Sequence, residues 1–428
     1  MTHPPLPTGR AAWTGYAGWT LAALYFFYAW ILRVSPSVMV DELMRDFAVT
    51  GAILGNLSAV YFYAYAAIQM PVGMALDRWG PRRVLSIAAL VAGVGAGLFA
   101  WAPGVQVAYL GRALIGGGCA FGLVGSMVLA AAWFPPRRFA LLSGLALGIG
   151  FVGGIGGQAP LAVLVEAQGW RASLGMLAAG ALVLSAATWL VTRDRPPGAA
   201  APAGQGQADG APSVWRALWD VARRPQTLVI SAFGSLISAP GLAFGGLWGV
   251  PYTMQVYGVE RPEAAFAVSS ILMGWAVGAP LWGWISDRVG RRKAPVVAAA
   301  LVAVASLLPV LYVPDLPLGL YRLLLFVNGV GSSAVSVSYA LVREHNAAGN
   351  TGASLGLLNM MVVAGGAVFQ PVIGLLLDWA WDGTLAGGAR VYSLDAYASA
   401  FLVLPVLYAL ALLAALFVRE TYCRPVAR

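Results

Sequence analysis

Long apolar stretches, each of about 20 residues or more, follow one another along this chain with only short polar turns between them. A stretch of this length crosses a bilayer as an α-helix, and it is much longer than the alternating strands of about ten residues in a membrane β-barrel. Charged residues make up 10% of the 428 residues, whereas soluble domains carry about 25%. The sequence therefore predicts an all-α integral membrane protein without strands in its spans, and not a soluble enzyme.

The stretches form two groups of six, because the connection after the sixth is long and rich in Pro, Ala and Gly, like a flexible linker. We predict one six-helix bundle over residues 1–192, a linker over 193–225 and a second bundle over 226–428. A short amphipathic helix is expected over 213–224. The predicted spans are 16–39, 51–76, 84–102, 106–133, 141–165, 171–192, 226–256, 264–285, 294–313, 318–341, 351–377 and 396–418.

The basic residues are distributed unevenly across the predicted membrane. When both termini are placed in the cytoplasm, nineteen of the 26 Lys and Arg residues fall on that side, and four (Arg45, Arg171, Arg261 and Arg390) fall on the opposite side. Since cytoplasmic loops are enriched in Lys and Arg, both termini are predicted to be cytoplasmic. The net charge of +9 is spread over separate turns, which argues against nucleic acid as a partner.

The two halves repeat several features at nearly the same interval. GMALDRWGPRR at residues 73–83 corresponds to GWISDRVGRRK at residues 283–293. Arg112 and Arg322 are separated by the same 210 positions, and Gln158 and Gln370 by 212. Duplicated halves of this kind place a binding site between them near the middle of the membrane.

In these features the chain resembles the major facilitator superfamily over nearly its whole length. The most specific element is that family's loop between the second and third helices, G-x-x-x-D-R-x-G-R-R. The resemblance implies that this loop latches the cytoplasmic side in the outward-open state; the alternative is a basic loop that only sets the orientation. The loop is present twice, as Gly73, Asp77, Arg78, Gly80, Arg82 and Arg83, and as Gly283, Asp287, Arg288, Gly290, Arg291 and Arg292.

A second family element, R-x-x-x-G-x-G in the fourth span, is present as Arg112, Gly116 and Gly118. Arg322 occupies the position of Arg112 in the second half, and each arginine lies near the outer end of its span. Because of this symmetry, we expect the two arginines to share a structural or gating role.

Two segments, YFFYAWILRVSPSVMVDELMRDF and FGGLWGVPYTMQVYG, are similar to two branches of the superfamily. One is the dipeptide-transporting branch known from lysosomes, with its bacterial relatives; the more distant one comprises the organophosphate and sugar-phosphate permeases. The phosphate permeases place one arginine in span 1 and one in span 7. Arg33 matches the first, but residues 231–257 contain no basic residue, which weakens the phosphate interpretation.

Arg33 is the strongest candidate for substrate binding. An ionisable side chain inside the membrane is costly and usually functional, and no Asp or Glu falls within the predicted spans. Tyr25, Arg33 and Ser37 are spaced by multiples of four and so share one helix face. A guanidinium binds a carboxylate or a phosphate through two hydrogen bonds. The alternative is that Arg33 reaches the outer headgroups or pairs with Asp41 or Glu42.

Polar and aromatic side chains at helical spacing complete the predicted lining of the site. Tyr and Trp can pack against a ligand and also offer one hydrogen-bonding group. Interhelical bonding or anchoring at the membrane surface would explain any one of them equally well. The candidates are Tyr61, Tyr65, Gln158, Trp248, Tyr252, Asn359 and Gln370.

The sequence contains no metal-ligand cluster, phosphate-binding glycine loop or nucleophile motif, so we expect no cofactor and no metal. We predict a monomeric secondary active or facilitative transporter of a small solute with an anionic group, such as an amino acid, a dipeptide or an organic acid. The composition points to a bacterial inner membrane. Symport and uniport both stay open, because no intramembrane carboxylate is evident. The alternatives are an organophosphate or sugar-phosphate permease and a transporter-fold membrane sensor without flux.

Overall fold

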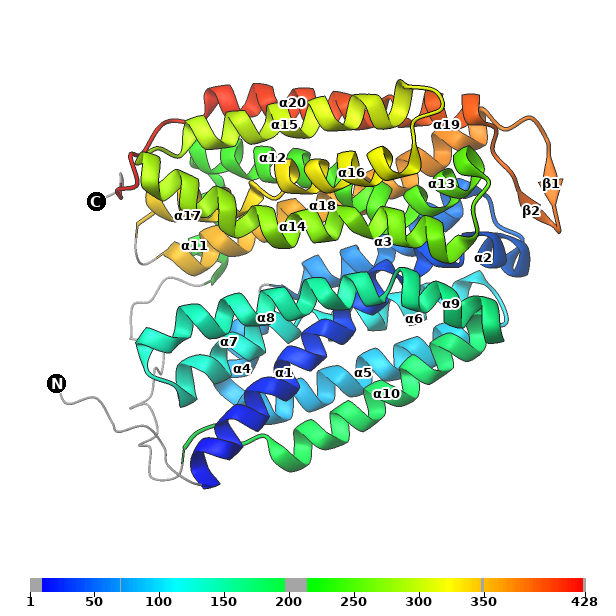
Figure 1. Ribbon diagram of the computed structural model, residues 1–428. Coiled ribbons are helices and arrows are strands. Elements are labelled where there is room, and N and C mark those ends of the chain that lie inside the picture. Colours follow the sequence, from blue (N-terminus) through cyan, green and yellow to red (C-terminus); the bar gives the residue numbers. More distant parts are fainter. Residues whose placement is uncertain (1–9, 70, 197–213, 348–349, 426–428) are drawn as a thin grey trace.

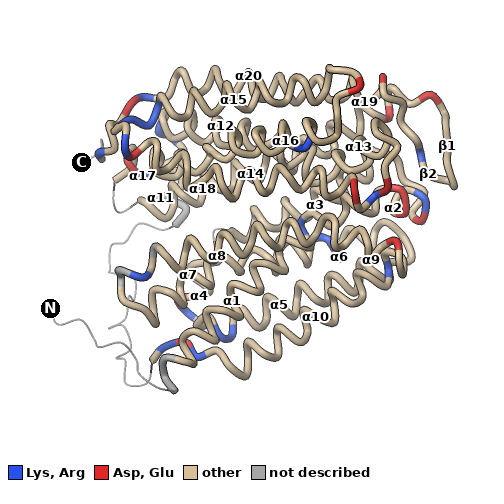
Figure 2. The backbone as a smooth tube through the Cα atoms, in the orientation of Figure 1, with Lys and Arg blue, Asp and Glu red and all other residues tan. Residues whose placement is uncertain are grey.

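A computed structural model describes residues 10–69, 71–196, 214–347 and 350–425. Within these ranges, twelve helical segments are long and apolar enough to cross a membrane. Figure 1 shows them in two bundles, one from each half of the chain, and α1 begins on the side where α20 ends. We call this side the terminal side. Charged residues gather mainly toward the two ends of the helices (Figure 2). The predicted fold of two six-helix bundles is confirmed.

Several spans of the first bundle consist of two helices, because a proline or a glycine interrupts them. The short helix α2 (Val40–Phe47) connects the first two spans. The spans are α1 (Arg10–Val34) with the 3-10 helix η1 (Ser35–Val38), α3 (Gly51–Ile68) with α4 (Pro71–Trp79), α5 (Pro81–Ala100), α6 (Val105–Cys119) with α7 (Gly122–Trp133), α8 (Pro136–Gly156) with α9 (Ala159–Gln168), and α10 (Trp170–Val191).

The second bundle begins after the short helix α11 (Val214–Ala222), which lies within the predicted helix over 213–224. Residues 197–213 of the predicted linker lie outside the described residues. A two-stranded antiparallel hairpin, β1 (Leu385–Ala386) and β2 (Ala389–Arg390), follows α18. The spans are α12 (Pro225–Pro240), the π-helix η2 (Gly241–Trp248) and α13 (Gly249–Tyr257), then α14 (Arg261–Val289), α15 (Lys293–Tyr312), α16 (Leu318–Ser332) with α17 (Val335–His345), α18 (Thr351–Trp379), and α19 (Leu394–Phe401) with α20 (Val403–Phe417).

Glycines allow the helices of each bundle to approach closely. A Cβ atom on Gly116 of α6 would lie 2.1 Å from the main-chain oxygen of Tyr61 in α3, and one on Gly118 would lie 2.6 Å from that of Ala88. These distances are too short for any side chain, so only glycine permits the observed packing. The second family element thus fixes the position of α6 against α3 and α5.

The two bundles are joined between α3 and α18, on the side opposite to the terminal side. The carboxylate of Asp378, near the end of α18, accepts hydrogen bonds from the main-chain N–H groups of Gly51 (2.9 Å) and Ala52 (2.8 Å). Tyr392 and Arg390 donate to the same carboxylate over 2.7 and 3.0 Å. The first N–H groups of a helix lack intrahelical partners and carry a partial positive charge. Asp378 therefore stabilises the start of α3 and connects the bundles.

Further contacts between the bundles also lie toward this opposite side. The carboxylate of Glu42, in α2, forms an ion pair of 2.7 Å with Arg261 at the start of α14. Gln158 donates from Nε2 to the main-chain oxygen of Gly245 over 2.8 Å. These bonds close the two bundles against each other at this end of the molecule.

The bundles diverge toward the terminal side, where α11 and α17 lie apart from α7 and α8 (Figure 1). A Cβ atom placed on Gly73 of α4 or on Gly283 of α14 would meet no atom within 4 Å. Among the described residues, these two glycines of the repeated loop therefore make no close contact with another helix in this arrangement. The described contacts between the bundles hold them at the opposite side instead.

We predict that Asp378→Asn separates the bundles on the opposite side. An amide is a weaker partner than a carboxylate for the helix start and for Arg390, and each charge-assisted hydrogen bond contributes about 1.5–3 kcal/mol. Spin labels on Gln106→Cys and Pro314→Cys, in a background without other cysteines, should report a larger fraction of long distances. The fraction should rise about fivefold or more, which corresponds to about 1 kcal/mol.

Asp382→Asn is the matched control, because Asp382 lies in the same connection and is fully exposed. The distance distribution of this variant should equal that of the unmodified chain. Equal distributions for Asp378→Asn and Asp382→Asn would contradict the role that we assign to Asp378.

Candidate functional site

Arg33 lies in the last turn of α1, and only 8% of its surface is exposed. Its guanidinium carbon lies 4.3 Å from the ring centre of Trp30, 5.1 Å from that of Tyr65 and 5.5 Å from that of Tyr61. Nε also points at the Tyr61 hydroxyl oxygen, 3.4 Å away. A cation is attracted to the face of an aromatic ring, so these three rings partly compensate the burial of the charge.

No carboxylate neutralises Arg33 within the part of the chain that the structure describes. None of the ion pairs there includes it, and Nη1 and Nη2 have no hydrogen-bond partner among those residues. Glu42, one of the two acids that could have paired with it, is bound to Arg261. The near-complete burial also excludes a position among exposed headgroups. Both alternatives to an inward-facing Arg33 are therefore wrong.

Arg112 is completely buried in α6 and holds the backbone beside Arg33. It donates from Nη1 to the main-chain oxygen of Leu32 over 2.9 Å and from Nη2 to that of Ser58 over 3.0 Å. Its guanidinium carbon lies 5.2 Å from the ring centre of Tyr61. One tyrosine ring thus contacts two guanidinium groups, and Arg112 fixes the turns of α1 and α3 that carry Arg33 and Tyr61.

Arg322 does not repeat the environment of Arg112. Its side chain is 31% exposed and forms a 3.0 Å ion pair with Glu263 near the start of α14. The two arginines therefore differ in their contacts, since among the described residues main-chain oxygens accept from the guanidinium of Arg112 and a carboxylate pairs with that of Arg322. The shared structural or gating role stays a prediction. The partner of Arg322 lies just outside the predicted span over 264–285, because α14 begins at Arg261 and includes Glu263.

Other tyrosines surround the Arg33 group. The rings of Tyr61 and Tyr65 stack with their centres 6.0 Å apart. Tyr25 is 1% exposed and its ring lies near that of Tyr28, and the hydroxyl groups of both are buried without a partner among the described residues. These hydroxyl groups can donate hydrogen bonds to a polar ligand.

The second bundle contributes Tyr339 of α17, which interacts electrostatically with Tyr65 and with Arg33. Its hydroxyl group donates to Oδ1 of Asn359 in α18 over 3.0 Å. The structure therefore brings the predicted residues Arg33, Tyr65 and Asn359 toward one region between the bundles.

Trp30 and Tyr339 were missing from the residues selected by sequence. Trp30 could have been found, because it precedes Arg33 by three positions and so lies on the same helix face. Tyr339 could not, since only the packing of the two bundles places α17 near α1.

Four other predicted lining residues are engaged in the packing near the π-helix η2. Gln158 accepts from Ser37 and donates to Gly245, while Gln370 donates from Nε2 to the main-chain oxygen of Leu242 over 2.9 Å. π-Helical turns shift the backbone hydrogen bonds and are frequent at functional sites. In this arrangement both glutamines hydrogen-bond to main-chain oxygens of η2. Trp248 donates to the Gln370 main-chain oxygen, and Tyr252 donates to the Val310 main-chain oxygen within an aromatic cluster.

The two copies of the repeated loop differ in their contacts. In the second copy, Arg292 binds both Asp287 (2.7 Å) and the buried carboxylate of Glu344 (2.8 Å). Burial alone would lower the pKa of Arg292, but the bonds to these two acids outweigh it and raise the pKa. In the first copy, Arg82 donates from Nε to the Trp189 main-chain oxygen. Asp77 is exposed and forms no ion pair within the described residues.

No group of three or more His, Cys, Asp or Glu side chains is placed to hold a metal ion within the described ranges. The side chains around Arg33 are suited to bind a ligand. The region combines one buried guanidinium, flat aromatic surfaces and unpaired hydroxyl groups, which together suit an anionic organic molecule.

A family model described as the Major Facilitator Superfamily matches residues 21–274 and 241–426. A putative tartrate transporter from Agrobacterium vitis is 27% identical over 66% of each chain, so the chain spans slightly less than two thirds of that relative's length. A gentisate transporter from Corynebacterium glutamicum is 24% identical over 85% of this chain and 83% of the relative. A membrane sensor protein from Salmonella typhimurium is 26% identical over 93% and 90%.

The chain is also similar to the crystal structure of a bacterial homologue of the human lysosomal transporter Spinster. The TM-score is 0.76 with 15% identity, over 94% of this chain and 96% of that chain. At this identity the likeness supports the fold alone, and it agrees with the two bundles described above.

We predict that Arg112→Leu destabilises the protein strongly, whereas Arg322→Leu does not. The first substitution removes a fully buried side chain and both of its hydrogen bonds to main-chain oxygens, at a cost of about 2–5 kcal/mol. The second removes a partly exposed ion pair, which contributes about 0–1 kcal/mol. Thermal unfolding in detergent should show a drop of several degrees in Tm for Arg112→Leu and almost none for Arg322→Leu. Similar drops in both variants would contradict the difference between the two sites.

Proposed function

The chain belongs to the major facilitator superfamily, and from this premise we propose that it carries a small organic anion across the membrane by alternating access, with Arg33 binding the anionic group. Membership identifies a transporter and not an enzyme. The nature of the solute rests on the residues around Arg33 and on the relatives.

The observation that carries this proposal is the buried guanidinium of Arg33, which has no carboxylate partner within the described ranges. An uncompensated charge inside a membrane protein is expensive and marks a functional site. A carboxylate that enters from water would satisfy Nη1 and Nη2 together. Tartrate and gentisate, which the names of two relatives give as their solutes, both bear carboxylate and hydroxyl groups.

Charge and shape favour a carboxylate over a phosphate ester. Arg112 donates to backbone carbonyl groups and is fully buried, so Arg33 is the guanidinium that can reach a solute. Span 7 adds no basic residue. One available cation suits a singly charged group better than a phosphate dianion. Trp30, Tyr61 and Tyr65 offer flat surfaces against which the body of an organic acid can pack.

Alternating access in this proposal moves the bundles between two arrangements. Asp378 and the Glu42–Arg261 ion pair hold the opposite side closed in the present one. In the other arrangement, the two repeated loops would close the terminal side, with Asp77 and Asp287 meeting helix starts of the facing bundle. The excess of Lys and Arg supports a cytoplasmic position for the terminal side.

We predict that Arg33→Lys and Arg33→Ala abolish most transport. Lysine keeps the charge but loses the paired donors of the guanidinium, and alanine loses both. A thermal-shift screen of organic acids, with tartrate and gentisate included, would select the solute, because a ligand of the folded state raises its stability. Uptake of that solute into proteoliposomes should then fall about ten- to hundredfold, as expected for the loss of a charge-assisted pair.

Arg322→Gln is the matched control, since it also removes an arginine from a span. Its uptake should stay near that of the unmodified chain. Unchanged uptake by Arg33→Ala, at equal protein content of the proteoliposomes, would overturn the assignment of Arg33.

A sensor without flux is the second candidate, supported by the similarity to the membrane sensor protein over 93% of this chain. The same thermal-shift and uptake measurements separate the two functions. A solute that stabilises the protein but never accumulates in proteoliposomes would support the sensor, whereas saturable uptake would exclude it.

A further inference from the structure

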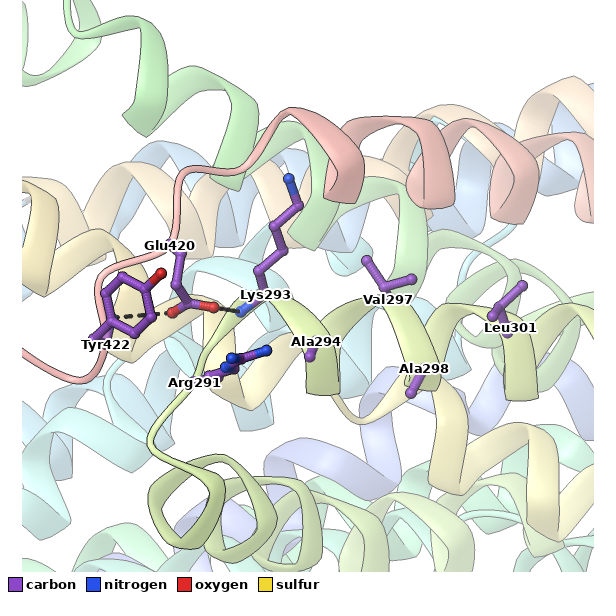
Figure 3. Close-up of a pocket in the computed structure, with 8 residues that line it drawn as sticks. All are labelled: Arg291, Lys293, Ala294, Val297, Ala298, Leu301, Glu420 and Tyr422. Atoms are coloured by element: carbon purple, nitrogen blue, oxygen red, sulfur yellow. Dashed lines mark hydrogen bonds between the residues drawn. The ribbon is translucent and has the colours of Figure 1, made fainter.

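A second ligand site lies at the start of α15, away from Arg33. A groove of about 520 Å³ lies at this point, where α15 meets the segment after α20. Figure 3 shows the residues that line it. Its polar end contains Arg291, Lys293, Glu420 and Tyr422. The site is independent of the proposed transport of an anion, because none of these residues contacts the Arg33 region.

The apolar end of the groove follows one face of α15. Ala294, Val297, Ala298 and Leu301 recur at helical spacing and line it. Two of them are alanines, which leave space beside the helix, and Leu301 is 51% exposed. Since α15 is a predicted membrane span that begins at Lys293, this face starts at the membrane boundary. It continues about 12 Å along the helix axis to Leu301, which is the direction that an acyl chain follows.

Arg291 gives the polar end a positive charge that has no ion-pair partner among the described residues. The guanidinium of Arg291 is exposed and has no ion pair or hydrogen bond within the described residues. Lys293 donates from Nζ to the last turn of α20 at the Leu416 oxygen. The groove therefore combines an unpaired cation at the membrane surface with an apolar channel that leads into the membrane.

The negative charge of Glu420, which also lines the groove, is compensated by main-chain donors. Its carboxylate accepts hydrogen bonds from the main-chain N–H groups of Arg292 (2.8 Å), Lys293 (2.9 Å), Thr421 (3.0 Å) and Tyr422 (3.0 Å). Partial burial opposes ionisation, but these N–H groups outweigh it and hold the pKa of Glu420 below its ordinary value. The negative charge is thus used to fix the chain after α20 against the start of α15.

The first bundle provides an internal comparison, because residues 81–87 correspond to residues 291–297 at an interval of 210. There Asp194 accepts from the main-chain N–H of Arg82, as Glu420 does from that of Arg292. Pro81 stands where the second bundle has Arg291, and Val84 and Ile87 stand in place of Ala294 and Val297. Both bundles have a carboxylate that caps the loop. The first bundle, however, has Pro81 in place of Arg291, and its side chains at positions 84 and 87 are bulkier than those at 294 and 297.

We propose that this groove binds an anionic phospholipid, with the phosphate at Arg291 and one acyl chain along Ala294, Ala298 and Leu301. Basic pockets at the membrane surface between transmembrane helices recognise such headgroups. A free phosphate would gain nothing from the apolar face, whereas a phospholipid satisfies both ends of the groove together. The site is specific to the second bundle.

Native mass spectrometry of the full-length chain, purified in a neutral detergent, tests this proposal. Dioleoyl phosphatidylglycerol and dioleoyl phosphatidylcholine share their acyl chains and differ in charge. We expect preferential retention of the phosphatidylglycerol by the unmodified chain. Arg291→Gln should lower that retention about fivefold, since one basic residue at an anionic surface contributes about 1 kcal/mol. Ala298→Leu, which fills the groove, should lower the retention of phosphatidylglycerol even though Arg291 is intact.

Arg83→Gln is the matched control, because it removes an exposed arginine from the corresponding loop of the first bundle. Its lipid retention should equal that of the unmodified chain, and glycerol 3-phosphate should not displace the lipid. Circular dichroism and size-exclusion elution verify that each variant is folded. Equal retention by Arg291→Gln and Arg83→Gln, equal retention of the two lipids, or displacement by glycerol 3-phosphate would each overturn the proposal.

Discussion

The two hydrogen bonds of Arg112 to backbone carbonyl groups hold the centre of the first bundle together. They join α6 to the end of α1 at Leu32 and to α3 at Ser58, and the Arg112 side chain that makes them is fully buried. Both carbonyl groups lie next to residues of the candidate site, since Leu32 precedes Arg33 and Ser58 lies one turn before Tyr61. The glycine that follows on the same helix, Gly116, lets α3 approach closely enough for this contact. The position of Arg33 depends on this arrangement.

Arg33 and Arg112 show how the same side chain can serve two purposes at short range. Arg112 has donated its paired Nη groups to the backbone and is fully buried, so its charge is part of the fold. Among the described residues, Arg33 contacts the Tyr61 hydroxyl over 3.4 Å and three aromatic faces, and its Nη groups are available to a ligand. Both side chains are buried, so the electrostatic difference between Arg33 and Arg112 comes from their hydrogen-bond partners. This difference is why an anion is expected at Arg33 and not at Arg112.

The duplicated halves have diverged where their surroundings differ. Arg322 is paired with Glu263 and partly exposed, although it corresponds to Arg112. The second repeated loop joins Arg292 to Glu344, whereas the described part of the first offers Asp77 no such partner. A capping carboxylate is kept in both, as Asp194 and as Glu420, while the residues beside it differ. The two bundles thus share one arrangement of helices and loops, and local substitutions give each bundle its own polar contacts.

The twelve spans and their grouping follow from the amino-acid sequence alone, and so does the choice of Arg33 as a candidate, because bilayer thickness and the cost of a buried charge act on every membrane protein alike. The sequence also indicated the repeated loops, since their spacing is visible along the chain. The tertiary structure decided which polar groups meet. Only the relative position of the two bundles brings Tyr339 of α17 within electrostatic range of Arg33, and only the break in span 7 engages Gln158 and Gln370 with η2. Such pairings depend on helix rotation and on the relative position of the bundles, which spacing along one helix cannot specify.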